Sequence, residues 1–396
     1  MTDCKNKHMV RVLLLFIFGL FFFSSCNDQD FPSIDILVSE PIGWNKKQEC
    51  TIIYLAHNDN EKLDARIKCR GGMSSKFEKH SFALELNNKY NLLGINRDDD
   101  WILNANYIDK TFMRHKISYD LFRQMNPDNI AARSAYINVN INGNYNGLYV
   151  LMEEINAKMA GLNKKDSMAM LFKDPPIFYP EKLSYVEDPN NYYQQKYPKI
   201  YDKDHTDYIE QFIDFIFHSP DSVFVKNIAT WIDIDNVIDW HLLLLFTNNS
   251  DGILKNFLLV KQNSHSPFKI ALWDYDHSFG RDGDNELNMM ENELDCHRSV
   301  LLKRLEQIEQ THYSKKLEKR WHTLRNKNIF SVQNINKHIE KNHQTIKKQV
   351  KNNFEKWPVD SKWYYDSNTY WQEIEIIQEF VKVRIEQLDQ KFDYHK

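Results

Sequence analysis

Short strand-like segments, separated by turn-forming Asn, Asp and Gly, dominate the first part of this chain and limit the folds that it can adopt. Three runs between residues 50 and 86 are expected to be β-strands, namely residues 51–55, 65–69 and 81–86. In the last run Phe82, Leu84 and Leu86 share one face. A β-hairpin is predicted around the turn dipeptide Asn142-Gly143, which residues 136–141 and 147–152 flank.

Helical patterns are expected to dominate the second part of the chain, from about residue 204. Residues 235–246 are apolar nearly all round, which predicts a buried helix, and an amphipathic helix is expected near the C-terminus. One earlier helix is predicted over residues 109–125, with Asp109 or Thr111 as its cap and Asn126-Pro127 as its end. Residues 257–260 and 269–273 predict a second hairpin, and residues 175–201 are expected to be irregular.

This order of elements predicts the α+β class with two lobes. Residues 50–156 are expected to form a β-rich N-terminal lobe, and residues 157–396 a helix-rich C-terminal lobe that carries the functional loops. The chain of 396 residues is long enough for both lobes, and its 42% of hydrophobic residues excludes wholesale disorder.

The first residues predict an export signal rather than part of the fold. Lys5, Lys7 and Arg11 precede or begin an apolar run that ends in Ser24-Ser25-Cys26. Residues 1–25 are therefore expected to be removed and Cys26 to be lipidated, with residues 26–49 as an acidic tether and lead-in. A lipid anchor implies the cell envelope, on the periplasmic side or the outer-membrane surface. The alternative is an uncleaved transmembrane anchor, for which the apolar run is short.

Charge and cysteine content exclude two further classes. The 51 Lys and Arg nearly balance the 55 Asp and Glu, so no basic field favours a nucleic-acid partner. Five cysteines are too few for a disulfide scaffold. Cys50 and Cys69 lie in strand-like segments, and the sequence leaves open whether they pair.

Two polar clusters follow buried segments of the second part and predict a divalent-cation site. Asp251 and Asn256 come just after the predicted buried helix, and Asp274 and Asp276 follow the second predicted hairpin. Carboxylate and amide oxygens are the ligands that Mg²⁺ prefers, together with phosphate oxygens. Asp276 is equally compatible with a helix cap, and Asp251-Gly252 alone is a common turn.

The spacing of these residues is similar to that of a kinase catalytic loop, in which an Asp orients the hydroxyl nucleophile and an Asn, separated from it by four residues, holds a metal. Upstream, the Gly-rich segment that contains Arg70, Gly72, Ser74 and Ser75 could wrap phosphate groups with its backbone N–H groups. Lys79 is placed to neutralise phosphate, although a solvated lysine at a strand edge would have the same spacing.

Together these segments resemble the CotH family, the spore-coat-protein-H-like atypical protein kinases. The resemblance is carried by residues 70–75, 79–82 and 142–149, by Asp251 with Asn256, and by residues 273–276. It implies a distantly protein-kinase-like fold that uses ATP and Mg²⁺ or Mn²⁺ to phosphorylate Ser or Thr of exported proteins. By position, Asp251 matches the catalytic Asp, Asn256 and Asp274 the metal positions, and Lys79 the phosphate-binding Lys.

Two other functions compete with the kinase hypothesis. The chain has Asn249-Ser250 where kinases carry His-Arg before the catalytic Asp, so a surface lipoprotein that keeps the scaffold without catalysis is the main alternative. The Asp-x-Asp spacing of Asp274 and Asp276 also occurs in metal-dependent sugar transferases.

Overall fold

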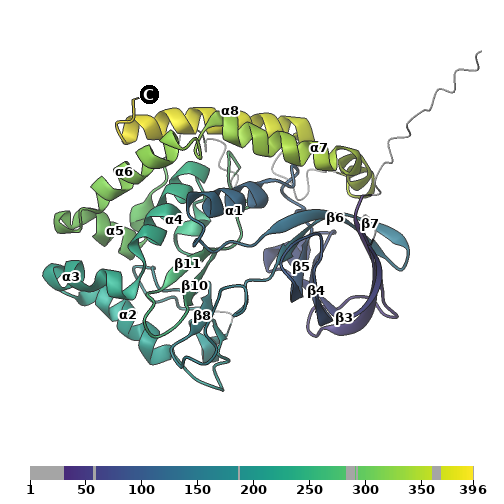
Figure 1. Cartoon of the computed structure of the whole chain (residues 1–396), viewed down its shortest axis with the longest axis horizontal. Helices are drawn as coiled ribbons and strands as arrows, with labels where there is room; N and C mark the ends of the chain where they lie inside the picture. The colour runs from purple at the N-terminus through teal and green to yellow at the C-terminus, as the bar shows by residue number, and fades with distance from the viewer. Residues whose placement is uncertain are drawn as a thin grey trace, which may run out of the picture.

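The computed structural model describes residues 31–56, 59–185, 188–281, 290, 293–358 and 367–395. The predicted signal and the lipidation site at Cys26 lie outside these residues. In the described part, a β-barrel lies at one end of the molecule and a group of helices around a small sheet at the other (Figure 1). The mixed α+β class is thereby confirmed.

Seven strands close the barrel in the order β1-β2-β3-β4-β5-β7-β6. Neighbouring strands are antiparallel except where β1 closes the barrel by pairing in parallel with β6. The strands are β1 (Ser33–Leu37), β2 (Gln48–Ala56), β3 (Asp59–Arg70), β4 (Ser81–Tyr90), β5 (Asp98–Asn104), β6 (Ser134–Ile141) and β7 (Asn144–Glu153). Alternate side chains, among them Ile52, Ile67 and Leu84, fill its interior.

The remaining elements form the helical part, which surrounds a four-stranded sheet of order β11-β10-β8-β9. Its strands are β8 (Met170–Lys173), β9 (Gln195–Tyr197), β10 (Phe257–Lys261) and β11 (Lys269–Leu272). The helices described are α1 (Arg114–Met125), α2 (Thr206–His218), α3 (Asp221–Trp231), α4 (Ile234–Thr247), α5 (Val300–Gln307), α6 (Tyr313–Asn326), α7 (Val332–Lys356) and α8 (Tyr370–Lys391). Although α1 connects two barrel strands, it packs on α4 in the helical part.

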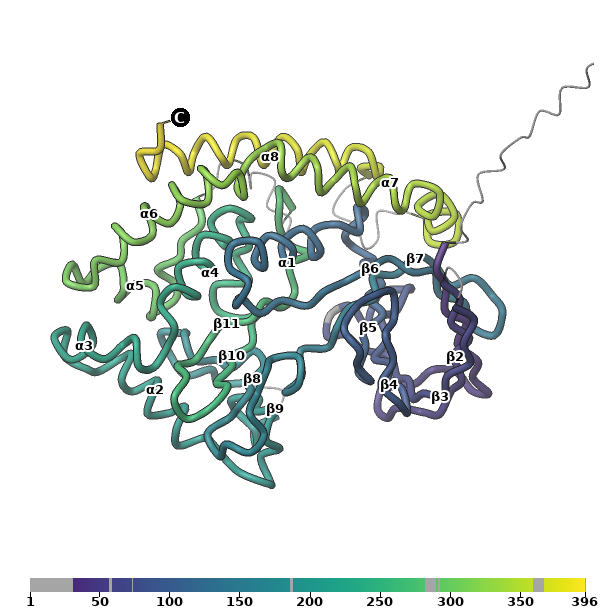
Figure 2. Tube along the Cα trace, in the orientation of Figure 1, coloured from purple at the N-terminus to yellow at the C-terminus, as the bar shows by residue number. Residues whose placement is uncertain are grey.

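One wall of the barrel belongs to both halves of the molecule. Strand β7 is buried on both faces, because Tyr149 and Leu151 point into the barrel core while Leu148 and Val150 join the core of the helical part. Helix α7 also reaches from the helical part to the barrel, where its end lies beside β6 and β7 (Figure 2). These contacts fix how the barrel and the helical part meet.

The predicted strands, both hairpins and the buried helix α4 are confirmed. The early helix begins at Arg114 rather than at residue 109, because Phe112 adopts a left-handed backbone (φ 61°) that cannot continue a right-handed helix. The barrel begins at Ser33, inside the expected lead-in, rather than at residue 50.

The structure answers the question that the sequence left open for the two cysteines, and it corrects one further expectation. Cys50 and Cys69 are both free, since Cys50 lies opposite Ala65 and Cys69 opposite Phe82 in the barrel. Residues 175–201 are mostly irregular as expected, but they contribute strand β9 to the small sheet. Within the described residues, no helix combines the length and the apolar content that crossing a bilayer requires.

Candidate functional site

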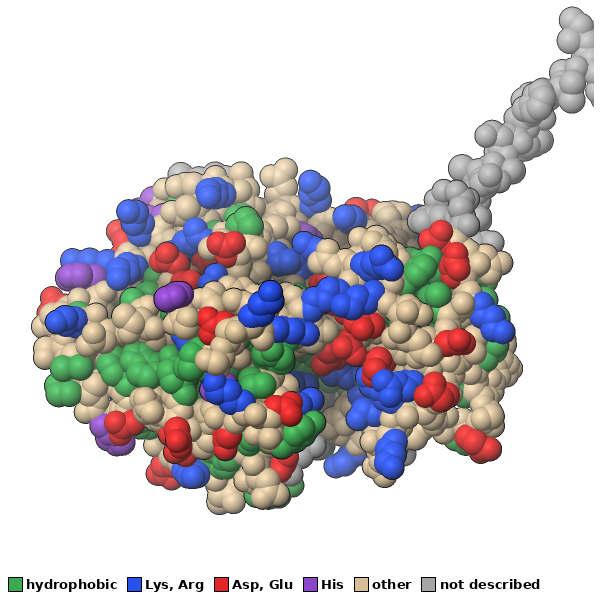
Figure 3. Space-filling view, turned by 60° about the horizontal axis from the view of Figure 1, so that its bottom comes forward, with side chains coloured by type: hydrophobic (Ala, Val, Ile, Leu, Met, Phe, Trp, Pro, Cys, Tyr) green, Lys and Arg blue, Asp and Glu red, His purple; other side chains and the backbone are tan. Residues whose placement is uncertain are grey.

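A large cavity lies between the barrel and the helical part, with a volume of about 1600 Å³. In the space-filling view, basic and acidic side chains gather where the surface between the two parts is hollowed (Figure 3). All but one of the predicted catalytic, nucleotide-binding and metal-binding residues line this cavity: Arg70, Gly72, Ser74, Lys79, Asp251, Asn256, Asp274 and Asp276. The exception is Ser75, which is exposed on the turn η1 (Met73–Lys76).

The small sheet explains why residues distant in sequence meet here. Strands β8 and β11 end, and β10 begins, at the same edge of this sheet, because β10 pairs antiparallel with both. Asp174, Asn256 and Asp274 stand at that edge, next to these three strand ends. The N–H of Asp174 donates to the carbonyl of Phe257 (2.9 Å), and the N–H of Trp273 donates to that of Asn256 (3.1 Å).

The three polar residues at this edge share an uncommon backbone conformation. Their φ angles are 49° for Asp174, 61° for Asn256 and 51° for Asp274. Asn and Asp tolerate the left-handed region better than other residues that carry a side chain, and such conformations concentrate at functional sites. The left-handed turn at each strand end therefore directs a polar side chain toward the cavity wall instead of continuing the strand.

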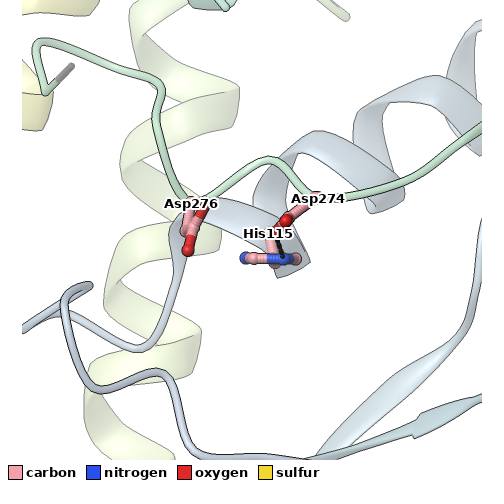
Figure 4. A group of neighbouring side chains, drawn as sticks. All are labelled: His115, Asp274 and Asp276. Atoms are coloured by element: carbon pink, nitrogen blue, oxygen red, sulfur yellow. Dashed lines mark ion pairs between the residues drawn. The ribbon is translucent and has the colours of Figure 1, made fainter. Parts of the chain in front are cut away.

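His115, Asp274 and Asp276 form a compact cluster in the cavity (Figure 4). Their ligand atoms lie within 4.8 Å of one another, and Nε2 of His115 is 3.1 Å from Oδ1 of Asp274. His115 is 4% exposed, and its Nδ1 has no hydrogen-bond partner among the described residues. One imidazole nitrogen and two carboxylates are a donor set that fits a divalent transition-metal ion such as Mn²⁺. Mg²⁺ takes oxygen ligands, so it would use the two carboxylates.

The charged groups of this cluster shift one another's pKa values. Burial alone would raise the pKa of Asp274, but the hydrogen bond and charge of His115 hold it well below its usual range. Burial and the neighbouring Asp274 carboxylate raise the pKa of Asp276 to about 6. Burial would lower the pKa of His115, yet the two carboxylates raise it. Perturbed pKa values of this kind are typical of functional sites.

Buried hydrogen bonds hold the cluster in place from the helical side. Arg114, next to His115 on α1, donates to Oδ1 of Asp109 (2.8 Å), to the carbonyl of Ser278 (2.9 Å) and to Oε2 of Glu373 on α8 (2.9 Å). The hydroxyl of Tyr119 accepts from the N–H of Asp274 at 3.0 Å. The described residues 277–281 form no helix, so Asp276 does not act as the helix cap that its spacing also allowed.

Asp251 lies in the turn η3 (Asp251–Ile253) that follows α4. Its Oδ2 is 2.9 Å from Nζ of Lys255, and its side chain is about one third exposed. The buried Asn249 joins this turn to the metal-ligand loop, since its Oδ1 accepts from the N–H of Gly252 (2.9 Å) while its Nδ2 donates to the carbonyl of Asp274 (3.5 Å). Asn249 therefore has a structural role at the position where kinases carry His.

Lys79 is neither solvated nor free to bind phosphate through its ammonium group. It is 2% exposed, and its Nζ donates to the carbonyls of Ala105 (2.8 Å) and Leu148 and to Oδ1 of Asn353 on α7 (3.0 Å). All three N–H groups of the ammonium are thus engaged. The geometry favours a structural role for Lys79 in place of the expected phosphate contact.

Sequence reasoning missed several polar residues of this cavity, among them His115, Lys173 and Asp174. His115 lies on the predicted early helix, but nothing in its spacing relates it to Asp274. Lys173 and Asp174 end a strand of four residues, which is too short for periodicity to reveal. Only the pairing of β8 with β10 brings them beside Asn256.

Comparisons with known proteins identify the family of this chain. The sequence profile described as "CotH kinase protein" matches residues 67–388, which include all the cavity residues discussed above. Inner spore coat protein H of Bacillus subtilis (strain 168) is 24% identical over 226 residues. That match covers 57% of this chain and 61% of the relative, so the chain spans about three fifths of that protein's length. Since the profile covers most of the sequence, the chain belongs to the CotH family of kinase proteins.

Proposed function

We propose that this protein is a metal-dependent kinase that transfers the γ-phosphate of ATP to Ser or Thr side chains of exported proteins. The observation that carries the proposal is the convergence of His115, Asp251 and Asp274 on one cavity between the barrel and the helical part. Membership of the CotH kinase family supports this class of chemistry. The volume of about 1600 Å³ is ample for a nucleotide together with an acceptor side chain.

His115, Asp274 and Asp276 are the residues that would hold the divalent cation, with Asn256 at the same sheet edge. A bound cation would supply positive charge to phosphate oxygens. The low pKa of Asp274 keeps its carboxylate ionised at neutral pH, as a metal ligand must be. The buried bonds of Arg114 and Tyr119 orient these ligands before any ligand binds.

Asp251 is proposed to orient the acceptor hydroxyl and to receive its proton. In the reaction the hydroxyl oxygen forms a bond to the γ-phosphorus, the bond from that phosphorus to the β-γ bridging oxygen breaks, and the proton passes to Oδ1 or Oδ2 of Asp251. Lys255, 2.9 Å from Oδ2, holds the carboxylate at the cavity wall. Positioning and charge stabilisation would supply most of the rate enhancement.

Export and lipidation complete the proposal. The relative's name describes a protein of the inner spore coat, and the segment before Cys26 has the order of an export signal. We expect fatty acid to label the wild-type protein and not Cys26→Ser. Full-length protein that retains Met1 and carries no lipid would contradict the anchor and leave the kinase proposal untouched.

The decisive experiment separates Asp251 from Asp274. Asp251→Asn should bind ATP with Mg²⁺ or Mn²⁺ within a few-fold of the wild type, but transfer labelled γ-phosphate about 100-fold more slowly or worse, because the amide cannot take the proton. Asp274→Asn should weaken the metal–nucleotide binding itself, since an amide is a poorer ligand. Calorimetric titration and transfer to a Ser/Thr-rich exported protein provide the two readouts.

Other outcomes would replace the proposal. Equal loss of nucleotide binding in Asp251→Asn and Asp274→Asn would contradict the division of roles. ATP binding by the wild type without transfer to any acceptor would identify a catalytically inactive scaffold. Binding of a nucleotide sugar in preference to ATP would indicate the sugar-transferase chemistry that the Asp274 and Asp276 spacing also allows.

A further inference from the structure

Two cationic side chains, those of Lys173 and Arg70, form cation–π contacts with the indole ring of Trp273. Nζ of Lys173 lies 4.0 Å from the ring centroid and Cζ of Arg70 lies 5.1 Å from it. The three residues come from different elements, since Arg70 ends β3 in the barrel, Lys173 ends β8, and Trp273 follows β11. All three line the cavity, and Trp273 directly precedes Asp274 of the metal-ligand cluster.

Two like charges thus contact one aromatic ring, and neither has a direct counter-ion among the described residues. Among the residues that the structure describes, neither Arg70 nor Lys173 forms an ion pair with a carboxylate. Burial and the charge of Arg70 lower the pKa of Lys173, and the charges of Glu154 and Asp174 offset this only in part. Cation–π contacts compensate a fraction of the repulsion. A polyvalent anion that contacts both cations would compensate the rest and leave both charges paired.

We propose that Lys173 and Arg70, held against Trp273, form a site that binds a chain of phosphate groups and joins the barrel to the helical part. The inference deepens the proposed function, on which it rests for the identity of the anion as phosphate. The site is built without His115, Asp274 or Asp276, so its phosphate affinity persists when no metal is present. It also assigns to Lys173 and Arg70 the charge neutralisation that the sequence pattern assigned to Lys79.

Trp273 is a positioning residue in this site. An Arg on one strand end and a Lys on another would separate under their mutual repulsion, and the ring provides a common surface for both. The backbone N–H of Trp273 donates to the carbonyl of Asn256 (3.1 Å), which fixes the ring relative to the sheet edge. Phosphate bound there would lie next to the cluster at Asp274.

The test uses sodium tripolyphosphate. It has neither the base nor the sugar of a nucleotide, so its binding reports on the chain of phosphate groups alone. Calorimetric titration of the full chain in EDTA should show binding by the wild type, and Lys173→Gln or Arg70→Gln should weaken it about tenfold or more, because each removes charge-assisted hydrogen bonds to phosphate. Lys173→Arg should retain binding. Lys76→Gln, which removes a lysine of the same cavity in η1, is the matched control and should change the affinity less than threefold.

The role of Trp273 is tested separately, with two substitutions of this residue. Trp273→Leu should weaken tripolyphosphate binding by about tenfold while Trp273→Phe keeps most of it, at an equal melting temperature, because only the aromatic ring gathers the cations. Equal affinity in wild type, Lys173→Gln and Arg70→Gln would overturn the site. If these variants also bind ATP–Mg²⁺ normally while Asp274→Asn does not, the phosphate site fails and the proposed kinase stands. If the wild type binds tripolyphosphate through both cations but transfers no phosphate from ATP to any protein acceptor, the phosphate site is supported and the kinase proposal is rejected.

Discussion

His115 shows how a single residue enters the site through the fold alone. It comes from α1, which leaves the barrel after β5, packs on α4 and returns to β6, so that its buried Nε2 faces Asp274. Its neighbour Arg114 is fully buried and ties the helix to α8 and to the loop that carries Asp276. The histidine is therefore held in place from two sides before any cation arrives.

We predict that His115→Gln weakens Mn²⁺ binding by about tenfold or more, because it removes one of three clustered ligand atoms. His277→Gln is the matched control. Its Nε2 lies 3.7 Å from Oδ1 of Asp276, and it lines the same cavity without belonging to the cluster. Calorimetric titration of each variant with Mn²⁺ gives the affinities. A His115 variant that binds Mn²⁺ as the wild type does would remove His115 from the ligand set.

A second histidine, His241 on α4, should make the stability of the fold depend on pH. It is 1% exposed, with its Nδ1 3.1 Å from the hydroxyl of Tyr313, and burial together with the charges of Lys391 and His297 lowers its pKa to about 3. The unfolded value is about 6.5. Protons therefore bind the unfolded chain first, so this contribution to stability is complete above about pH 6.5 and declines as the pH falls toward about 3.

Between pH 7 and pH 5 this contribution should fall by about 2 kcal/mol. We expect the free energy of unfolding, measured with urea at both pH values, to drop by that much more in the wild type than in His241→Phe, which keeps the aromatic contact with Tyr313. His218→Gln, which alters an exposed histidine, should follow the wild type. Identical pH profiles for the wild type and His241→Phe would show that His241 does not carry the dependence.

At the scale of elements, the sequence predicted those strands and hairpins that hydrophobic alternation and turn-forming residues determine. The hairpin at Asn142-Gly143 is one case, since Asn142 has the left-handed φ of 50° that such turns require. Alternation over residues 81–86 predicts β4 because one of its faces fills the barrel. In contrast, β8 and β9 have four and three residues and exist only through pairing with neighbours, so the cavity edge at Lys173 and Asp174 could not be predicted.

Helix α7 provides an element-scale prediction because its Asn353 accepts from both Nζ of Lys79 and the N–H of Leu148. Asn353→Leu should reduce the free energy of unfolding by about 3 kcal/mol, since it leaves a buried ammonium group partly unpaired. Lys79→Met removes the charge, and the double variant should recover part of the loss, because both polar partners are then replaced by apolar groups. Urea unfolding of the four proteins completes the double-mutant cycle.

The same variants decide the role of Lys79. If Lys79 is structural, Lys79→Met should bind ATP–Mg²⁺ within a few-fold of the wild type at a temperature where both are folded. Gly147 makes the packing of this region tight, since a Cβ there would lie 2.9 Å from Oδ1 of Asn353 and 2.9 Å from Cε of Lys79. Loss of nucleotide affinity in Lys79→Met without loss of stability would restore the phosphate contact that the sequence pattern suggested.

For the whole molecule, eight of the nine site residues predicted from the sequence line the cavity, but the sequence did not predict how their elements meet. Asp251, Asn256 and Asp274 could be grouped because they follow successive elements of one segment. That Arg70 reaches them depends on the closure of the barrel and on the wall that β7 shares with the helical part. Such contacts join residues far apart in the chain, and no local pattern encodes them.

The shared wall also predicts how the molecule unfolds. Because β7 contributes to both hydrophobic cores, neither the barrel nor the helical part can lose its packing without exposing apolar side chains of the other. Leu84→Ala in the barrel core and Leu324→Ala on α6 should each cost about 2–5 kcal/mol and each shift one common thermal transition. Hydrogen exchange of peptides from β3 and from α6 reports the two halves separately. We expect the peptides from β3 and from α6 to exchange faster than in the wild type in both variants, because the whole molecule unfolds more often. Destabilisation confined to β3 in Leu84→Ala and to α6 in Leu324→Ala would mean that the halves unfold independently and that the shared wall does not couple them.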